Sequence, residues 1–265
     1  MKRYKYWSLI ATATTLFVGC DSGSSIGNTG GISSNGNGNN GGSSISVSLP
    51  ANVTDAINAP KSTLSQEVKD AIAYMYSEEG LAHDVYLNIY NYQPVRQLQN
   101  IATRSEVKHI EAVNQLAIKY DLNMTRYPDT DVPYDISGIG NGSYPVDTVQ
   151  YLYNLLFDKG IQSQQDALEV GCMVEVVDVE DLNGYIAAAS ASGASDVVTV
   201  LGFLRAGSYN HYWAFDAGLK NMGIADGCCS VPDALGHTYC HPEYPQNETG
   251  QGTGSGNGQG RGNKR

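Results

Sequence analysis

Four stretches of the chain repeat apolar residues at alternating steps of three and four, the pattern of a helix with one buried face. The predicted helices run from about Ser65 to Tyr90, Val95 to Tyr120, Gln164 to Ala189 and Ser195 to Met222. Ser65 is a residue type that commonly caps a helix N-terminus. The pattern therefore predicts an all-α fold.

Each apolar stripe is interrupted near its middle by residue types that bind metals. These residues are Glu79, Glu106, His109, Glu175 and His211. A buried carboxylate or imidazole costs free energy unless it is paired, hydrogen-bonded or bound to a metal. Glu106 and His109 are three residues apart, so both project from one side of their helix. Because every helix carries such residues at a matching depth, we predict one shared metal site inside a helical bundle.

The spacing resembles that of di-metal carboxylate bundles, in which two helices each supply a Glu and two supply Glu-x-x-His. The fourth helix departs from this scheme, because Ser208 lies three residues before His211. Asp178, one turn further along the third helix than its Glu, is our candidate for the missing carboxylate. Oxygen and imidazole ligands favour iron or manganese, as one or two ions, and zinc stays open. Tyr86 and Tyr209 are placed either to donate hydrogen bonds to ligands or to pack.

The same residues also allow an interpretation without metal. A Glu in a helical stripe often extends its carboxylate to water, and a core His is often simply hydrogen-bonded. The protein would then be a non-enzymatic surface module with a buried polar network, and its acidic domain would bind a partner or sequester cations. Asp84, Glu111 and Glu180 are expected to be ordinary solvated charges. Whether the protein is an enzyme is left open.

The N-terminus has the features of an export signal. A short basic region precedes an apolar run from Trp7 to Val18, which is too short to span a membrane as a helix. Leu16–Cys20 resembles a bacterial lipobox, which implies removal of residues 1–19 and lipidation of Cys20. Gly, Ser and Asn dominate the sequence that follows, and we expect residues 20–59 to form a flexible tether. We therefore expect a protein of the bacterial cell envelope, held to a membrane by lipid.

One folded domain is expected over residues 60–245, followed by a disordered Gly-rich tail at 246–265. Between the second and third helices, the irregular stretch Asn123–Pro145 precedes a short amphipathic segment, Asp147–Lys159. We interpret this region as a long crossover that carries an extra short helix. The net charge of −11 and the lack of a basic stripe argue against a nucleic-acid partner.

Three cysteines follow the fourth helix, namely Cys228, Cys229 and Cys240. In an exported protein disulfide pairing is the default, so Cys228 or Cys229 is expected to bond to Cys240. A second metal site that adds His237 and His241 is the alternative. Cys172 lies on the core stripe of the third helix and is expected to be a buried free thiol that packs as a small apolar residue, with a soft ligand to the metal as the alternative.

Several segments together resemble a ferritin-like family catalogued only as domain of unknown function 2202. The segments are Ser77–Tyr86, Asn100–Val113, Asp166–Gly171 and Gly207–His211. The resemblance covers about Ala71 to Tyr244 and implies a ferritin-like four-helix bundle related to rubrerythrins.

In rubrerythrins the corresponding first-helix Glu and the Glu-x-x-His pair hold a di-iron centre. The resemblance therefore implies metal binding by Glu79, Glu106 and His109, with Glu175 and His211 as counterparts on the last two helices. Ferrous oxidation and peroxide reduction are the reactions that such a centre would suggest, but the family carries no settled activity. The chain has no Cys-x-x-Cys pair, so an electron donor would be external, and a homodimer is left open.

Overall fold

The structure, a computed structural model, describes residues 47–124, 141–144 and 147–246. These residues form helices and connecting turns, with no strand beyond an isolated bridge between Ala234 and His237. The longest helices are α2 (Gln66–Tyr90), α6 (Gln164–Ala191) and α7 (Ser195–Asn221). The all-α class is thus confirmed, and these three helices begin where the apolar pattern predicts.

The second predicted helix is not regular. It consists of α3 (Arg96–Ile101), a π-helical turn (Ala102–Glu106) and α4 (Val107–Lys119). A π turn accommodates one extra residue and often lies at a functional site. The apolar stripe predicted a single uninterrupted helix, because the periodicity carries no signal for a π turn.

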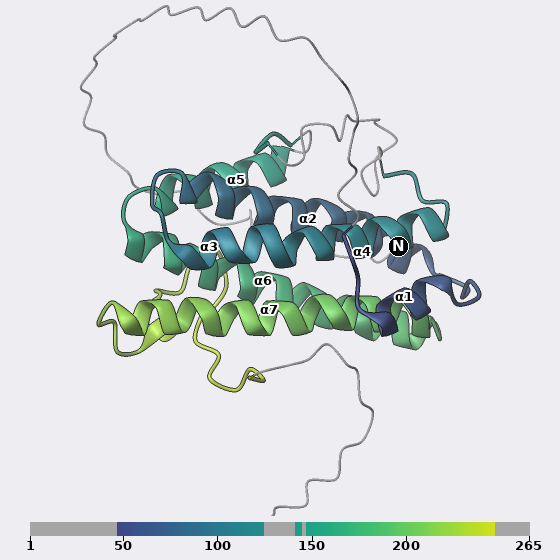
Figure 1. The fold of residues 1–265 in the computed structure, drawn as a ribbon. Helices are drawn as coiled ribbons and strands as arrows, with labels where there is room; N and C mark the ends of the chain where they lie inside the picture. Colours follow the sequence, from purple (N-terminus) through teal and green to yellow (C-terminus); the bar gives the residue numbers. More distant parts are fainter. Residues whose placement is uncertain (1–46, 125–140, 145–146, 247–265) are drawn as a thin grey trace, which may run out of the picture. The chain divides into compact units, whose positions relative to one another are not determined.

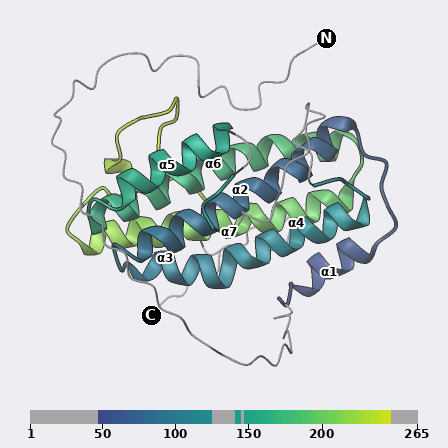
Figure 2. The ribbon, with the colours of Figure 1, turned by 90° about the horizontal axis from the view of Figure 1, so that it is seen from above.

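The long helices pack around a shared interior (Figures 1 and 2). α2 contacts α4 and α6, and α7 also contacts both α4 and α6. The short helix α5 (Asp147–Gly160) lies where it was predicted and packs against α2 and α6. Most of the predicted crossover before α5 lies outside the described residues.

A polar layer divides the apolar interior into two clusters. One cluster includes Leu81–Ile89 of α2 and Tyr212–Leu219 of α7, and the other includes Val68–Met75 and Val197–Leu204. The buried polar residues between them include Glu79, Glu106, His109, Glu175, Asp178, Ser208 and His211. The polar interruptions of the stripes therefore meet at one level of the core.

Serine side chains cap the N-termini of α2 and α6. Ser65 Oγ accepts a hydrogen bond from the backbone N–H of Val68 at 3.3 Å, and Ser163 Oγ accepts one from Asp166 at 3.0 Å. Such a cap contributes about 1 kcal/mol to helix stability. Local sequence signals therefore determine where these two helices begin.

Part of the predicted tether is folded. α1 (Ala51–Asn58) contacts α7 and α4, and Val53 on it is fully buried. The prediction of a flexible tether up to residue 59 is therefore wrong for residues 51–58. The apolar residues Val53 and Ile57, one helical turn apart, explain why this part forms a helix.

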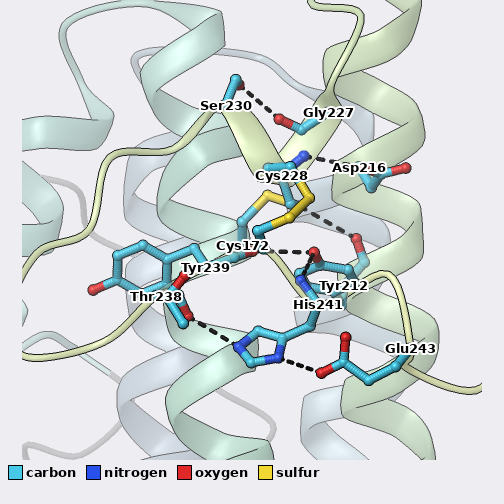
Figure 3. The surroundings of a disulfide bond; sticks show 12 residues. Cys172, Tyr212, Asp216, Gly227, Cys228, Ser230, Thr238, Tyr239, His241 and Glu243 are labelled. Atoms are coloured by element: carbon cyan, nitrogen blue, oxygen red, sulfur yellow. Dashed lines mark hydrogen bonds and ion pairs between the residues drawn. A yellow bond between two sulfur atoms is a disulfide. The ribbon is translucent and has the colours of Figure 1, made fainter.

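The segment after α7 folds back and is fixed by two disulfides. It contains a 3₁₀ turn, Gly227–Ser230, and the bonds are Cys172–Cys228 and Cys229–Cys240. Figure 3 shows the first bond beside Tyr212 and Asp216 of α7. The backbone N–H of Cys228 donates to Asp216 Oδ1 at 3.0 Å. The predicted disulfide to Cys240 is present, and its partner is Cys229 rather than Cys228.

The expectation of a free Cys172 is wrong, because the fold brings Cys228 to α6, which periodicity within one helix does not reveal. The alternative metal site fails as well, since its cysteines are all in disulfides. His237 Nδ1 instead pairs with Glu180 at 2.7 Å, and His241 Nδ1 pairs with Glu243 at 2.8 Å.

Asp84 is not a solvated charge. It is 1 % exposed and accepts hydrogen bonds from the Gly142 backbone N–H and the Tyr144 hydroxyl, both at 2.7 Å. The segment 141–144 covers this face of α2, and no pattern within α2 could show that.

The predicted leader, the lipidation site Cys20 and the tail beyond residue 246 lie outside the described residues. None of the described helices combines the length and apolarity that a membrane crossing needs.

Candidate metal centre

The five residues that interrupt the predicted stripes come together in the polar layer. Glu79 comes from α2, Glu106 and His109 from the junction of the π turn with α4, Glu175 from α6, and His211 from α7. Each is at most 6 % exposed. The site is therefore built by the long helices and closed to bulk solvent.

These residues form two triads that share Glu106. In the first, His109 Nδ1 lies 3.0 Å from Glu79 Oε2 and 3.0 Å from Glu106 Oε2. In the second, His211 Nδ1 lies 3.1 Å from Glu106 Oε1 and 3.3 Å from Glu175 Oε2. Within each triad the ligand atoms all lie within 4.8 Å of one another, and the two imidazole centroids are 5.5 Å apart. Glu106 thus offers one oxygen to each side, as a bridging carboxylate does.

Hydrogen bonds alone do not satisfy this cluster. Each Nδ1 atom faces two carboxylate oxygens, yet an imidazole nitrogen carries at most one proton. Glu79 Oε1 is buried without a hydrogen-bond partner, and the contacts of His211 Nδ1 with Glu106 Oε1 and Glu175 Oε2 are ion pairs only if His211 is protonated. A buried polar atom without a partner costs free energy, and a cation between these lone pairs would remove that cost. The donor set therefore fits a metal ion.

The buried carboxylates of the polar layer also favour a positive charge between them. Burial raises the pKa of Glu79 well above its ordinary range, and neighbouring Asp178 and Glu106 raise it further. Burial raises the pKa of Asp178 to about 8, with Glu175 adding to the rise. Burial lowers the pKa of His211, but the charges of Glu175 and Glu106 more than offset this and bring it to about 10. The carboxylates thus favour whatever cation, proton or metal, lies between them.

Burial similarly opposes ionisation of Glu106, but His211 and His109 outweigh it and hold the pKa of that carboxyl well below its usual range. Burial lowers the pKa of His109, and Glu106 reverses the effect, so the pKa is raised overall. Glu106 is therefore the carboxylate at the centre of the charge distribution, in keeping with its position in both triads.

Side chains around the triads hold the ligands in place. The Tyr86 hydroxyl donates to Glu175 Oε1 at 2.5 Å, and His211 Nε2 lies 2.7 Å from Ser105 Oγ. Metal-binding histidines usually hydrogen-bond through the second ring nitrogen in this way. Tyr209 takes the packing role, with its ring 5.0 Å from that of Tyr244.

The structure does not bring Asp178 into either triad. Its Oδ2 accepts a hydrogen bond from Ser208, whose hydroxyl also lies 3.1 Å from the Leu204 carbonyl oxygen. Asp178 is buried beside the ligands, but its role as a replacement carboxylate ligand has no support in this geometry. The Ser208–Asp178 bond also explains how a serine is accommodated on the buried face of α7.

Sequence reasoning gave no role to Ser105 or Gly207. Ser105, whose hydroxyl contacts His211, lies in the π turn, for which the apolar pattern carries no signal. Gly207 is adjacent to Ser208. The one sequence feature that could have marked it is a glycine in the interior of a predicted helix. A Cβ on Gly207 would lie 2.3 Å from His109 Nε2, so glycine leaves room for the imidazole.

Comparisons with known proteins match the chain to proteins without an assigned activity. Residues 68–231 match a family described as "Uncharacterized protein domain (DUF2202)". Uncharacterized protein MJ0754 of Methanocaldococcus jannaschii is 38 % identical over 164 residues, which are 62 % of this chain and 81 % of that protein.

The crystal structure of the same archaeal protein, described as hypothetical, superposes with a TM-score of 0.54 at 34 % identity. The match covers 62 % of this chain and 86 % of the archaeal chain. The matched family region, 68–231, contains all of the residues of both triads.

Proposed function

The chain belongs to the uncharacterized DUF2202 domain family, and from the geometry of its core we propose that it is a metal-binding protein whose two triads hold one or two iron or manganese ions. The observation that carries the proposal is the shared carboxylate of Glu106, with one oxygen turned to each of two buried imidazoles.

The ligand chemistry supports iron or manganese. Carboxylate oxygens and imidazole nitrogens suit these metals, and zinc is the competing occupant. The cysteine nearest the ligands in sequence, Cys172, is in a disulfide and offers no thiolate. The set also follows the di-metal carboxylate scheme of ferritin-like bundles, except that Ser208 replaces the Glu of the last helix. We accordingly propose a ferritin-like four-helix arrangement for α2, α3–α4, α6 and α7.

The chain's own residues would prepare the site for chemistry. Bound iron would supply redox chemistry: ferrous oxidation, which releases one electron per iron to an external oxidant, or peroxide reduction, which takes two electrons. Tyr86 orients Glu175, Ser105 orients His211, and the apolar clusters on both sides limit the access of water. Such fixed ligands cost little reorganisation when charge changes at the centre.

The competing function is a non-enzymatic surface module with no metal. Its support is the raised pKa of His211, because a protonated His211 would form ion pairs with Glu106 and Glu175. In that case the polar layer would be a buried network that specifies the packing of the helices. Glu79 Oε1, which is buried and has no hydrogen-bond partner even in that case, favours the metal instead.

Metal analysis of the purified full chain distinguishes the two functions. We expect about one to two ions of iron or manganese per chain, and a Glu106→Gln variant that stays helical but loses them. Glu111→Gln is the matched control, because Glu111 lies on α4, where its carboxylate accepts a hydrogen bond from the Gln115 amide. A helical wild-type protein that binds neither metal after incubation with ferrous or manganous salt would exclude the metal function.

We also propose that the mature chain is attached to a membrane of a bacterial envelope through a lipid on Cys20. The support is the lipobox-like Leu16–Cys20 after a basic and apolar leader. Membrane fractionation of cells that express the wild-type chain or Cys20→Ser tests this. Release of the variant into the soluble fraction is the expected result, and equal membrane association of both would contradict the anchor.

A further inference from the structure

A groove of about 570 Å³ lies between the last turns of α7 and Gln246, at the end of the segment that follows this helix. Trp213, Ala217 and Lys220 line it, and their spacing of four and three residues places them on one side of α7. His211 is two residues from Trp213 and projects from another side of the helix. The groove is therefore separate from the metal centre, and its volume is typical of a ligand site.

Trp213 is held in a fixed position in this groove. Its Nε1 atom donates to the carbonyl oxygens of Tyr244 and Pro245, both at 3.1 Å. Because the one polar atom of the indole is used by these bonds, the ring presents carbon atoms to the groove. Ala214 and Ala217 also line the groove, and their small side chains leave space beside the ring. The groove thus has an aromatic surface with room next to it.

The charged residues of the groove, Asp216 and Lys220, neutralise each other. Lys220 Nζ lies 2.8 Å from Asp216 Oδ2, and Asp216 Oδ1 accepts the backbone N–H of Cys228 at 3.0 Å. Both carboxylate oxygens are therefore engaged within the protein. The other polar lining residues are Asn210, Asn221 and Gln246. Because a side-chain amide both donates and accepts hydrogen bonds, these residues suit a ligand with hydroxyl groups.

The wall that faces α7 across the groove is held by covalent bonds. The Cys172–Cys228 bond joins the segment after α7 to α6, and Figure 3 shows Cys228 beside Asp216. The Cys229–Cys240 bond closes the loop that leads to residues 244–246. A site that is already ordered loses less conformational entropy when a ligand binds.

We propose that this groove binds a neutral saccharide, with a sugar ring against Trp213 and its hydroxyl groups bonded to the amides of Asn221 and Gln246. A sugar ring has apolar C–H faces and a polar edge, which match the indole carbons and the amides. A charged ligand would compete with the Asp216–Lys220 pair, and an apolar ligand would bury the amides without partners. This inference is independent of the proposed metal-binding function.

The test uses Trp213 as its own reporter. The chain has two tryptophans, so the full chain with Trp7→Phe emits indole fluorescence from Trp213 alone. This protein is titrated with cellobiose and with diacetylchitobiose, which distinguishes plain from N-acetylated neutral saccharides, and with digalacturonate as an anionic saccharide. Asn221→Ala and Gln246→Ala are made in the same background. Asn58→Ala is the matched control, because Asn58 is likewise an exposed amide at the last residue of a helix, α1.

We expect a saturable change in Trp213 emission with at least one of the two neutral saccharides and none with digalacturonate. Asn221→Ala and Gln246→Ala should each weaken the affinity about threefold to tenfold, the effect of one lost hydrogen bond. Asn58→Ala should bind as the parent does, and circular dichroism should show the same helix content in all variants.

Three results would overturn the saccharide site. They are an unchanged emission with both neutral saccharides, equal or tighter binding of digalacturonate, and a parent affinity in both amide variants. Metal analysis of the same samples separates this outcome from the proposed function, because loss of saccharide binding should leave the metal content unchanged.

Discussion

Gly207 and His109 occupy adjoining space: a Cβ atom on Gly207 of α7 would lie 2.3 Å from Nε2 of His109. Atoms cannot approach so closely without displacement, so the imidazole holds its position only because residue 207 lacks a side chain. His109 contacts both Glu79 and Glu106 through its other nitrogen. A small backbone position on one helix therefore determines the geometry of a ligand on another.

Gly207→Ala should displace His109 and lower metal affinity at least about tenfold, although alanine favours a helix more than glycine does. Titration with Mn²⁺, followed by electron paramagnetic resonance, measures the change. Gly202→Ala is the control, because nothing lies within 4 Å of a Cβ at Gly202 on the same helix. It should bind metal normally and be more stable by about 0.5–1 kcal/mol. Unchanged affinity in Gly207→Ala would show that His109 is not a ligand.

Tyr86→Phe should weaken metal binding about 10- to 100-fold, because it removes the hydroxyl that orients Glu175. The variant keeps the ring and its contact with Phe215, whose centroid is 5.3 Å away. Isothermal titration with Mn²⁺ gives the affinity. Tyr209→Phe, a change of the same kind at a tyrosine that packs against Tyr244, should bind as the wild type does. Equal affinities in both variants would assign Tyr86 to packing alone.

The two disulfides should differ in their contribution to stability. The Cys172–Cys228 bond joins residues 56 apart, whereas Cys229–Cys240 joins residues 11 apart. Because a longer closed loop restricts the unfolded chain more, removal of the first should cost about 4 kcal/mol and removal of the second about 3 kcal/mol. Urea unfolding of the two double-serine variants tests the order, and a larger loss from the short loop would contradict it.

Acid should destabilise the protein partly through Asp196. Burial raises the pKa of Asp196, but hydrogen bonds from Lys119 and Tyr120 outweigh this, so the pKa lies below its ordinary value. Because its pKa is lower in the folded state, Asp196 stabilises the fold above about pH 4, and this contribution is lost as the pH falls through the folded-state value. In Asp196→Asn, the free energy of unfolding should depend less steeply on pH below about pH 4.

Urea unfolding at a series of pH values from 2 to about 6 gives the slope. Asp121→Asn is the control, because the ion pair of Asp121 with Lys61 is exposed and such pairs contribute little. Its pH dependence should match that of the wild type. A wild-type slope in Asp196→Asn as well would show that the contacts with Lys119 and Tyr120 do not govern acid stability.

The sequence predicted most of the helices because each is encoded locally. Caps such as Ser65 and the three-four repeat of apolar residues fix where a helix begins and which side it buries. The same repeat also identified the metal-binding residue types, because Glu79 and His211 occupy positions where the repeat otherwise has apolar residues. Because these polar residues lie near the middle of each predicted helix, the sequence also indicated that they would meet in the folded bundle.

Only the tertiary structure decided how the helices bring partners together. The pairing of Cys172 with Cys228, the covering of Asp84 by residues 141–144 and the fit of Gly207 against His109 each join residues distant in sequence. The contact of Ser105, in the π turn, with His211 likewise joins residues distant in sequence. The physical reason is that helix periodicity reports which side of an element is buried, whereas the partner it meets is fixed by packing between elements.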